Sequence, residues 1–228
     1  YLADKELPAW YKKLDKSMIS EIETCQAFLN NSKSQLYDKD EIKANIEIDG
    51  AYADAIKAFK ALNFEQAVAI TAESIPHCTN DFSKAATYNN LGYFRQFTGQ
   101  FEKSLLDFEK ALEINPQQPF VNDNMAFSLI ALNRLLEAKK HLDVSEQLEN
   151  YDDGYLHRNL ACYYWKIGQI TKAKQNFELA LDFEAFDLIH QLYAKFLKAN
   201  GDIEQADMHL QLAKENGEVM AEKVLDVF

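Results

Sequence analysis

Histidines recur at matching intervals, so metal binding is the first chemistry to consider. His157 and His190 lie 33 residues apart, and His141 and His209 form a similar repeated pair. Imidazole nitrogens bind zinc at about 2.0–2.1 Å, whereas neighbouring packed helices lie about 8–10 Å apart. One ion could not reach equivalent positions on two neighbouring helices. We therefore predict no metal site and expect His157 and His190 to pack between helices.

The sequence also lacks the motifs that carry catalysis. It has no phosphate-binding glycine loop, Cys-x-x-Cys pair, His-Glu-x-x-His helix or nucleophile elbow, and its acidic residues are dispersed. Cys162, beside Tyr163, has no neighbouring feature that would activate its thiol, so a small buried side chain is expected. We predict that the chain is not an enzyme and uses no cofactor.

Charge and composition narrow the classes of partner. The 228 residues carry a formal net charge of −12, which argues against binding nucleic acid or anionic lipid through the surface as a whole. No apolar run approaches the roughly 20 residues that span a bilayer, so membrane insertion is not expected. Three scattered cysteines favour a reducing compartment and hence the cytoplasm, although the start at Tyr1 leaves a removed signal peptide open.

Recurring turns mark the elements that position these residues. Gly99, Gly168 and Gly201 each separate two segments with helical apolar periodicity, and Asn133 occupies the same place in another pair. Glycine, and less readily asparagine, adopts the left-handed conformation that ends a helix. The sequence thus predicts helix-turn-helix hairpins. The units start at about Ala85, Pro119, Gly154 and Asp187, which are 34, 35 and 33 residues apart.

Small residues recur where the two helices of a hairpin must approach closely. They are Gly92, Ala126, Ala161 and Ala194 in first helices and Ser104, Ala138, Ala173 and Ala206 in second helices, with Phe108, Leu142, Phe177 and Leu210 one turn later. With a period of about 34 residues, this pattern resembles the tetratricopeptide-repeat family. The best unit reads Tyr88, Leu91, Gly92, Ser104, Phe108, Ala111 and Pro116.

The sequence departs from the family pattern at a few positions. Arg95 stands where the family usually has an aromatic residue, with Phe94 beside it as a substitute, and Asn150 and Ala185 replace the closing proline. Departures of this kind are ordinary in these repeats.

The resemblance implies an all-α fold, a right-handed superhelical solenoid of helix-turn-helix hairpins with capping helices at both ends. Residues 1–47 are expected to form N-terminal capping helices, with the second over 34–45, and residues 218–228 a C-terminal capping helix. About five repeats are expected at 48–81 (degenerate), 85–118, 119–153, 154–186 and 187–217. In the first repeat the turn at 62–64 is expected to be one residue shorter, and residues 77–84 to form a connection.

In this family the first helices of successive hairpins line a concave groove, so the resemblance implies a binding site there. Asn90, Asn124 and Asn159 fall at the same place in three consecutive first helices. A carboxamide offers one acceptor and two donors, so it can pair with both halves of a peptide unit without reading its side chain. These asparagines are predicted to hold a ligand backbone. The alternative is that they face water or tie adjacent helices together.

Rings and cations surround these asparagines on the same predicted face. The rings are Tyr93, Phe97, Phe120, Phe127, Tyr155 and Trp165, and the cations are Arg158, Lys166, Lys195 and Lys198. Large rings bury much area with few rotors lost, which suits binding anchors, but packing between repeats would also explain them. The cations predict attraction to an acidic segment, against the alternative of ordinary solvated side chains.

These patterns predict an adaptor that binds an extended peptide or protein segment in the concave groove. One alternative is an architectural subunit that uses its convex face or capping helices in a larger assembly. Another is the targeting module of a larger enzyme. The sequence predicts neither the identity of the partner nor an oligomeric state.

Overall fold

The computed structural model of the protein describes residues 39–116, 119–147, 154–183 and 187–228. The chain divides into two compact units, Tyr1–Lys43 and Ala44–Phe228. The capping helices expected before residue 39 lie outside the described residues, as do Asn150 and Ala185. All contacts given below lie within the second unit.

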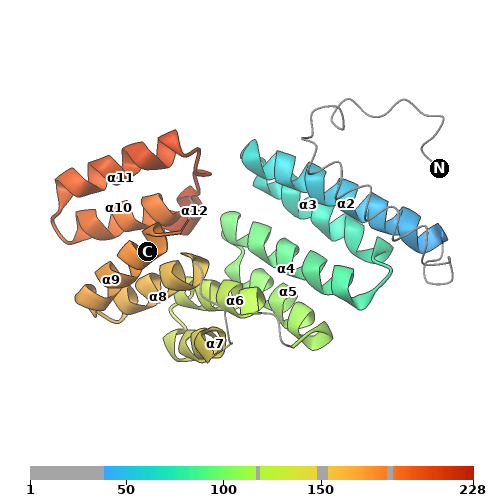
Figure 1. Ribbon diagram of the computed structural model, residues 1–228, viewed down its shortest axis with the longest axis horizontal. Helices are drawn as coiled ribbons and strands as arrows, with labels where there is room; N and C mark the ends of the chain where they lie inside the picture. The colour runs from blue at the N-terminus through green and yellow to red at the C-terminus, as the bar shows by residue number, and fades with distance from the viewer. Residues whose placement is uncertain (1–38, 117–118, 148–153, 184–186) are drawn as a thin grey trace, which may run out of the picture. The chain divides into compact units, whose positions relative to one another are not determined.

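The described ranges of the chain fold into helices and contain no strand (Figure 1). In chain order they are α2 (Lys39–Lys60), α3 (Phe64–Ser74), the short 3-10 helix η2 (Ile75–His77), α4 (Asp81–Phe97), α5 (Phe101–Ile114), α6 (Pro119–Ala131), α7 (Leu135–Gln147), α8 (Gly154–Lys166), α9 (Ile170–Leu181), α10 (Ile189–Ala199), α11 (Ile203–Glu215) and α12 (Glu222–Leu225). The expected all-α fold is confirmed.

The helices pack as a series of hairpins. The most extensive contacts join α4 to α5, α6 to α7, α8 to α9 and α10 to α11, and each of the first helices α4, α6, α8 and α10 also touches the next. Each hairpin has apolar residues that it cannot bury alone, so stacking hairpins builds one continuous core. The result is the expected helical solenoid.

The turns within the hairpins have the left-handed residues that the sequence predicts. The backbone angle φ is 72° at Gly99, 57° at Asn133, 75° at Gly168 and 86° at Gly201. Leu62 has the same conformation, with φ of 62°, between the end of α2 at Lys60 and the start of α3. That turn has the same length as the turn between α4 and α5, so the prediction of a shorter turn is wrong. A leucine takes the glycine position.

Two expected boundaries in the N-terminal part are also wrong. A single helix, α2, runs from Lys39 to Lys60, where the sequence suggested one helix over 34–45 and another repeat from residue 48. Gly50 lies inside this helix, because a lone glycine costs only about 1 kcal/mol relative to alanine. Helix α4 begins at Asp81 rather than Ala85. Asn80 ends the preceding connection, since its side chain accepts a hydrogen bond from the backbone N–H of Ser83 at 2.8 Å.

The small residues lie where helices cross. Gly92 is buried against the ring of Phe108, and a Cβ atom added at Gly92 would lie 2.5 Å from Phe108 Cε1. Arg95 forms an ion pair with the buried Asp107 of α5, while Phe94 fills the adjacent core. This ion pair explains why an arginine replaces the aromatic residue at this position.

The end of the stack differs from the expectation. Leu210 is 39% exposed, although Phe108, Leu142 and Phe177 at matching positions are fully buried. The reason is that α12 packs on α10 and α4, so it leaves the outer side of α11 uncovered. The segment expected to cap the last repeat lies on first helices instead.

Three hairpins join their two helices by a polar pair at the same spacing. Nδ1 of His141 lies 2.9 Å from Asn122 Oδ1, and Nδ1 of His157 lies 3.3 Å from Asn176 Oδ1. In the last hairpin the pair is His190 and His209, with 2.8 Å between their Nδ1 atoms. His190 and His209 are both buried, and burial lowers the pKa of each; the nearby His190 lowers that of His209 further.

Gly50 and Gly92 both lie inside helices, and alanine at these two positions should change stability in opposite directions. At Gly92 the added Cβ would overlap the Phe108 ring, whereas nothing lies within 4 Å of a Cβ at Gly50. We expect Gly92→Ala to lower the free energy of unfolding by about 1–3 kcal/mol. Gly50→Ala should raise it by about 0.5–1 kcal/mol. Urea unfolding measures both, and a stabilising Gly92→Ala would contradict the close approach of α4 and α5.

The His190–His209 pair should make the fold sensitive to acid. Both folded-state pKa values lie below the ordinary 6.5, so the unfolded chain binds more protons as the pH falls through 6.5. Stability is therefore complete above pH 6.5 and declines below it, by up to about 1.4 kcal/mol per pH unit for each proton. His209→Asn copies the asparagine that faces His157. It should flatten this decline in urea unfolding measured across a pH series.

The titratable residues next to His190 and His209, Glu218 and Tyr193, do not cause a similar loss of stability below pH 6.5. The carboxylate of Glu218 accepts the backbone N–H of His190 at 2.8 Å, and burial raises the pKa of Glu218 above its ordinary 4.5. Protonation of Glu218 therefore favours the folded state, the opposite sign. Tyr193, whose ring lies 4.7 Å from that of His209, has a pKa raised to about 12 and stays neutral throughout. An unchanged decline in His209→Asn would exclude the histidine pair as its cause.

Candidate functional site: a groove on the first helices

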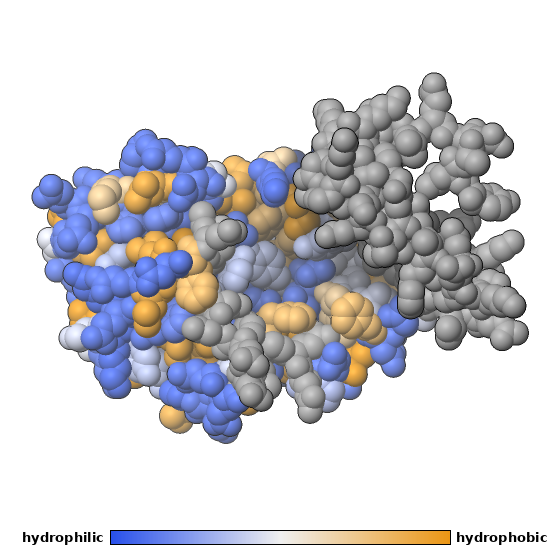
Figure 2. All heavy atoms as spheres, in the orientation of Figure 1, coloured by the Kyte–Doolittle hydropathy of each residue, from blue (hydrophilic) through white to orange (hydrophobic). Residues whose placement is uncertain are grey.

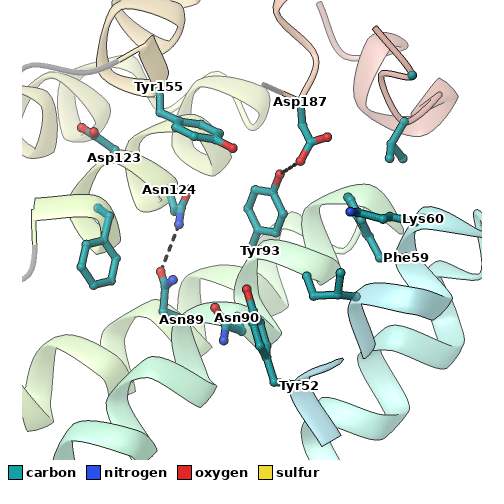
Figure 3. A pocket seen from close by; sticks show the side chains of 14 residues that line it. Tyr52, Phe59, Lys60, Asn89, Asn90, Tyr93, Asp123, Asn124, Tyr155 and Asp187 are labelled. Atoms are coloured by element: carbon teal, nitrogen blue, oxygen red, sulfur yellow. Dashed lines mark hydrogen bonds between the residues drawn. The ribbon is translucent and has the colours of Figure 1, made fainter. Parts of the chain in front are cut away.

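A groove of about 570 Å³ lies between α2, α4, α6 and α8. Its lining residues are Tyr52, Ile56, Phe59, Lys60, Asn89, Asn90, Tyr93, Phe120, Asp123, Asn124, Tyr155, Asp187, Gly217 and Val219. In the space-filling view the surface is hollowed near its centre, and hydrophobic side chains border the hollow (Figure 2). Figure 3 shows the rings of Tyr93 and Tyr155, the amides of Asn89 and Asn124 and the carboxylate of Asp187 around the groove, whereas the carboxylate of Asp123 points away from it.

An aromatic cluster fixes the α2 and α4 side of the groove. Phe59, near the end of α2, has its ring 5.9 Å from Tyr93 and 4.6 Å from Phe97. The same ring lies 5.5 Å from Phe64 at the start of α3. Because Phe59 is almost fully buried, it holds α2, α3 and α4 together at this wall.

Tyr93 joins this wall to the opposite one. Its hydroxyl donates a hydrogen bond to Asp187 Oδ2 at 2.7 Å (Figure 3). Burial and the negative charge of Asp187 hold the pKa of Tyr93 well above its usual value, so the hydroxyl keeps its proton as a donor. Asp187 precedes α10, next to Leu188, whose φ of 69° is left-handed. This irregular segment brings a carboxylate into the groove.

The three predicted asparagines have different roles in the structure. Asn90 is half-buried and lines the groove, and its side chain makes no hydrogen bond to the part of the chain that the structure describes. Asn124 also lines the groove, but its amide donates to Asn89 Oδ1 at 3.0 Å. Asn159 is fully buried and donates to the backbone carbonyl of Asp123 at 2.9 Å. For Asn124 and Asn159 the alternative holds, because they tie adjacent first helices together.

Arg158 does not project into the groove, which corrects the sequence-based prediction. Its side chain is 1% exposed. The guanidinium donates to Asn159 Oδ1 at 3.0 Å and to the backbone carbonyl of Asp187 at 2.9 Å. The guanidinium carbon also lies 4.7 Å from the ring centre of Phe127 and 5.0 Å from that of Tyr155. Arg158 therefore supports the groove wall from behind.

The predicted rings divide between groove and core. Tyr93, Phe120 and Tyr155 line the groove, and Phe120 is 43% exposed. Phe97 and Phe127 are buried, because Phe97 packs on Phe59 and Phe127 lies between Arg158 and Phe228. The ring of Trp165, half-buried, meets Phe196 edge-on at 5.5 Å. Exposure of Phe97, Phe127 and Trp165 to a ligand in the groove is therefore not supported.

The predicted lysines contact the C-terminal segment rather than the groove. Lys166 Nζ donates to the backbone carbonyl of Val227 at 2.5 Å, and Lys195 Nζ donates to that of Leu225. Burial, together with the nearby charge of Lys195, lowers the pKa of Lys166. Lys198 is exposed near the end of α10 and does not line the groove. The charged groups that do line it are Lys60, Asp123 and Asp187, so the predicted basic groove is wrong.

Several residues that line the groove were not predicted from the sequence. Asn89 lies one position before Asn90, and its pairing with Asn124 could have been anticipated only from the packing of α4 on α6. Tyr52 and Phe59 belong to α2, whose extent was predicted incorrectly. Asp187 stands in an irregular turn without periodicity. Only the 33-residue spacing from Gly154 marked it as the start of a unit.

Three further properties of the described residues concern metal binding, the reactivity of a thiol and membrane insertion. No group of three or more His, Cys, Asp or Glu side chains in the described ranges could hold a metal ion. Cys162 is fully buried, as expected, and burial raises the pKa of its thiol to about 12, which disfavours the reactive thiolate. Among the helices that the structure describes, none is both long and apolar enough to cross a membrane.

Comparison with known proteins agrees with this architecture. The family model of the tetratricopeptide repeat matches residues 85–118 and 158–186. No curated protein sequence matches the chain significantly. Among solved structures, the tetratricopeptide-repeat protein TTC0263 of Thermus thermophilus has a TM-score of 0.63 at 17% identity, over 79% of this chain and 94% of that one.

A second solved structure, PilW, a type IV pilus biogenesis factor, has a TM-score of 0.56 at 19% identity, over 76% of this chain and 79% of that one. At these identities the likeness concerns the fold alone. The family model and the hairpin geometry agree on the repeat itself. The chain therefore contains tetratricopeptide repeats, and its described helices form a solenoid of the tetratricopeptide-repeat kind.

Proposed function

We propose that this chain is an adaptor that holds a segment of another protein in the groove between α2, α4, α6 and α8. The groove itself carries the proposal. It combines half-buried or exposed rings, Tyr52, Tyr93, Phe120 and Tyr155, with the carboxamide of Asn90. Rings supply apolar area with few rotors to immobilise, and a carboxamide can pair with a peptide backbone.

The volume of the groove fits a short segment. About 570 Å³ lies within the usual range of about 300–1,000 Å³ for binding clefts, which is room for a few side chains and not for a folded domain. The ligand would therefore enter as an extended piece or a short turn, with one large apolar side chain against Phe120 and Tyr155.

Charge in the groove disfavours the acidic ligand that the sequence suggested. Two carboxylates, Asp123 and Asp187, and one ammonium, Lys60, line it, and the whole chain carries −12. Like charges placed together at an interface are destabilising. The proposed ligand is therefore a neutral or basic segment with an apolar anchor.

A second function is favoured by the uncovered side of α11. Leu210, whose counterparts Phe108, Leu142 and Phe177 are fully buried, is 39% exposed there, and Met208 elsewhere on the same helix is 51% exposed. In a solenoid the last hairpin normally needs a cover for such residues. They favour the architectural alternative, in which the end of the stack packs on another subunit of an assembly.

Photo-crosslinking separates these two functions. A photoreactive phenylalanine analogue placed at Phe120 reports on the groove, and the same analogue at Met208 reports on the end of the stack. For an adaptor we expect partner crosslinks at position 120 whose yield, at a partner concentration near the dissociation constant, falls when Asn90 is also changed to alanine. Crosslinks at position 208 alone, insensitive to Asn90→Ala, would favour the architectural subunit and contradict the adaptor.

A displayed library of random peptides tests the groove without a known partner. Peptides selected on the wild-type chain should share an aromatic or large aliphatic residue and lack acidic residues. Asn90→Ala should weaken them about fivefold, since one net hydrogen bond is worth about 1 kcal/mol. Phe120→Ala should weaken them at least as much, and calorimetry measures both. Phe82→Ala is the matched control, because Phe82 is exposed on α4 but outside the groove. Equal effects of Phe82→Ala and Phe120→Ala would exclude the groove.

A further inference from the structure

The last residues of the chain lie on the first helices. The ring of Phe228 stacks on Phe127 of α6, with 5.3 Å between ring centres and 29° between ring planes. Lys166 at the end of α8 donates to the carbonyl of Val227 at 2.5 Å and also lies 5.3 Å from the centre of the Phe228 ring. Lys195 of α10 donates to the carbonyl of Leu225. Three first helices therefore hold one short segment.

This segment has a firmly packed root and a less buried tip. In the root, residues 218–224, the side chains of Val219, Ala221 and Val224 are buried in the core. The carboxylate of Glu218 accepts the backbone N–H groups at the start of α10. In the tip, residues 225–228, the side chains are half-buried or, at Asp226, exposed. The root is buried in the core, whereas Leu225, Val227 and Phe228 of the tip are half-buried and pack against the outside of the core.

The contacts to the tip are of the kind that bind peptides. Two lysine ammonium groups donate to main-chain carbonyls, which every peptide offers, and one aromatic ring selects a side chain that can stack. Such contacts combine backbone affinity with a pocket for one anchor. Phe127, Lys166 and Lys195 were predicted from the sequence to contact a peptide, and in the structure they contact this one.

A purely structural cap would lie elsewhere. Leu210 of α11 remains 39% exposed at the end of the stack, although its counterparts in the earlier repeats are buried, and a cap would cover it. The chain instead places Phe228 on α6, well before the last hairpin, which is where a cap is required. Covering the end of the core does not explain that placement.

We propose that residues 225–228 are a displaceable self-ligand, and that Phe127, Lys166 and Lys195 form a second binding subsite for a short segment with an aromatic anchor. The chain occupies this subsite itself until a partner segment of the same chemistry replaces the tip. A short tether gives the tip an effective concentration on the order of millimolar, so only a partner that binds more tightly, or a weakened tip, opens the subsite. This inference extends the proposed function. It rests on that function in one respect, namely that ligands bind on the first helices.

Competition with a synthetic tip tests the proposal on the folded chain of 228 residues. The probe is an amidated peptide of residues 225–228, Leu-Asp-Val-Phe, behind a fluorescent glycine-serine leader, and its binding is followed by anisotropy. The amide removes any contribution from a terminal carboxylate. We expect Phe228→Gly to bind the probe at least about 10-fold more tightly than the wild-type chain, because the intramolecular competitor is weakened.

Asp226→Gly is the matched control, since it adds the same flexibility to the tip at an exposed side chain. It should bind the probe like the wild type. Adding Lys166→Met and Lys195→Met to Phe228→Gly should abolish binding, whereas adding Asn90→Ala should not change it. Equal binding by Phe228→Gly and Asp226→Gly, or none by either, would overturn the self-ligand.

Far-UV circular dichroism supplies a second readout. The helical content of Phe228→Gly should equal that of the wild type, and a loss of helix would show that the tip belongs to the fold, which also overturns the proposal. Library peptides that remain sensitive to Asn90→Ala while the probe fails to bind would leave the adaptor proposal standing and remove this one. If the probe binds but Asn90→Ala has no effect on library peptides, the self-ligand proposal stands and the adaptor proposal is removed.

Discussion

The buried guanidinium of Arg158 is the interaction on which both the groove and the surface that holds residues 225–228 depend. Removing a cation from water costs several kcal/mol, so its surroundings must satisfy it closely. Asn159 and the carbonyl of Asp187 accept its hydrogen bonds, and the rings of Phe127 and Tyr155 lie within 5.0 Å of the guanidinium carbon. Tyr155 lines the groove, and Phe127 carries the C-terminal tip. One buried charge thus sets the position of a ring on each surface.

The architecture was predictable from the sequence because the same structural requirement recurs in each repeat, so several positions indicate it independently. A left-handed residue must end each first helix, and Gly99, Gly168 and Gly201 signal it directly. Leu62 gives no such signal, although it adopts the same conformation. Its turn could be recognised only from the helices on both sides. The extent of α2 was missed for the opposite reason, because the Asp49-Gly50 pair, which is typical of a turn, lies inside this helix.

The site was less predictable, because a first helix of a solenoid meets neighbours on more than one side. Asn90 and Asn159 occupy equivalent sequence positions, yet one lines the groove and the other is buried between α6 and α8. A polar residue in this register can serve either a ligand or the next helix. The type of the residue and its spacing in the sequence do not distinguish a groove position from a buried one. The distance to the adjacent first helix does. Lys166 and Lys195 illustrate the same difficulty, because the repeat pattern does not predict that residues 225–228 contact them.

The groove and the surface that holds residues 225–228 share parts of the structure. Gly217 and Val219 line the groove and also begin the segment that ends in the tip. The ring of Phe127 contacts both the guanidinium of Arg158 and the ring of Phe228, so removing Phe228 would uncover part of a ring that packs on the buried guanidinium. A ligand that displaces the tip must restore that cover, which an aromatic side chain does and an aliphatic one does less completely. Because binding free energies are reciprocal, any effect of the tip on the groove equals the effect of a groove ligand on the tip. The contacts of Tyr155 with Arg158, of Arg158 with Phe127 and of Phe127 with Phe228 form a continuous series between the two surfaces.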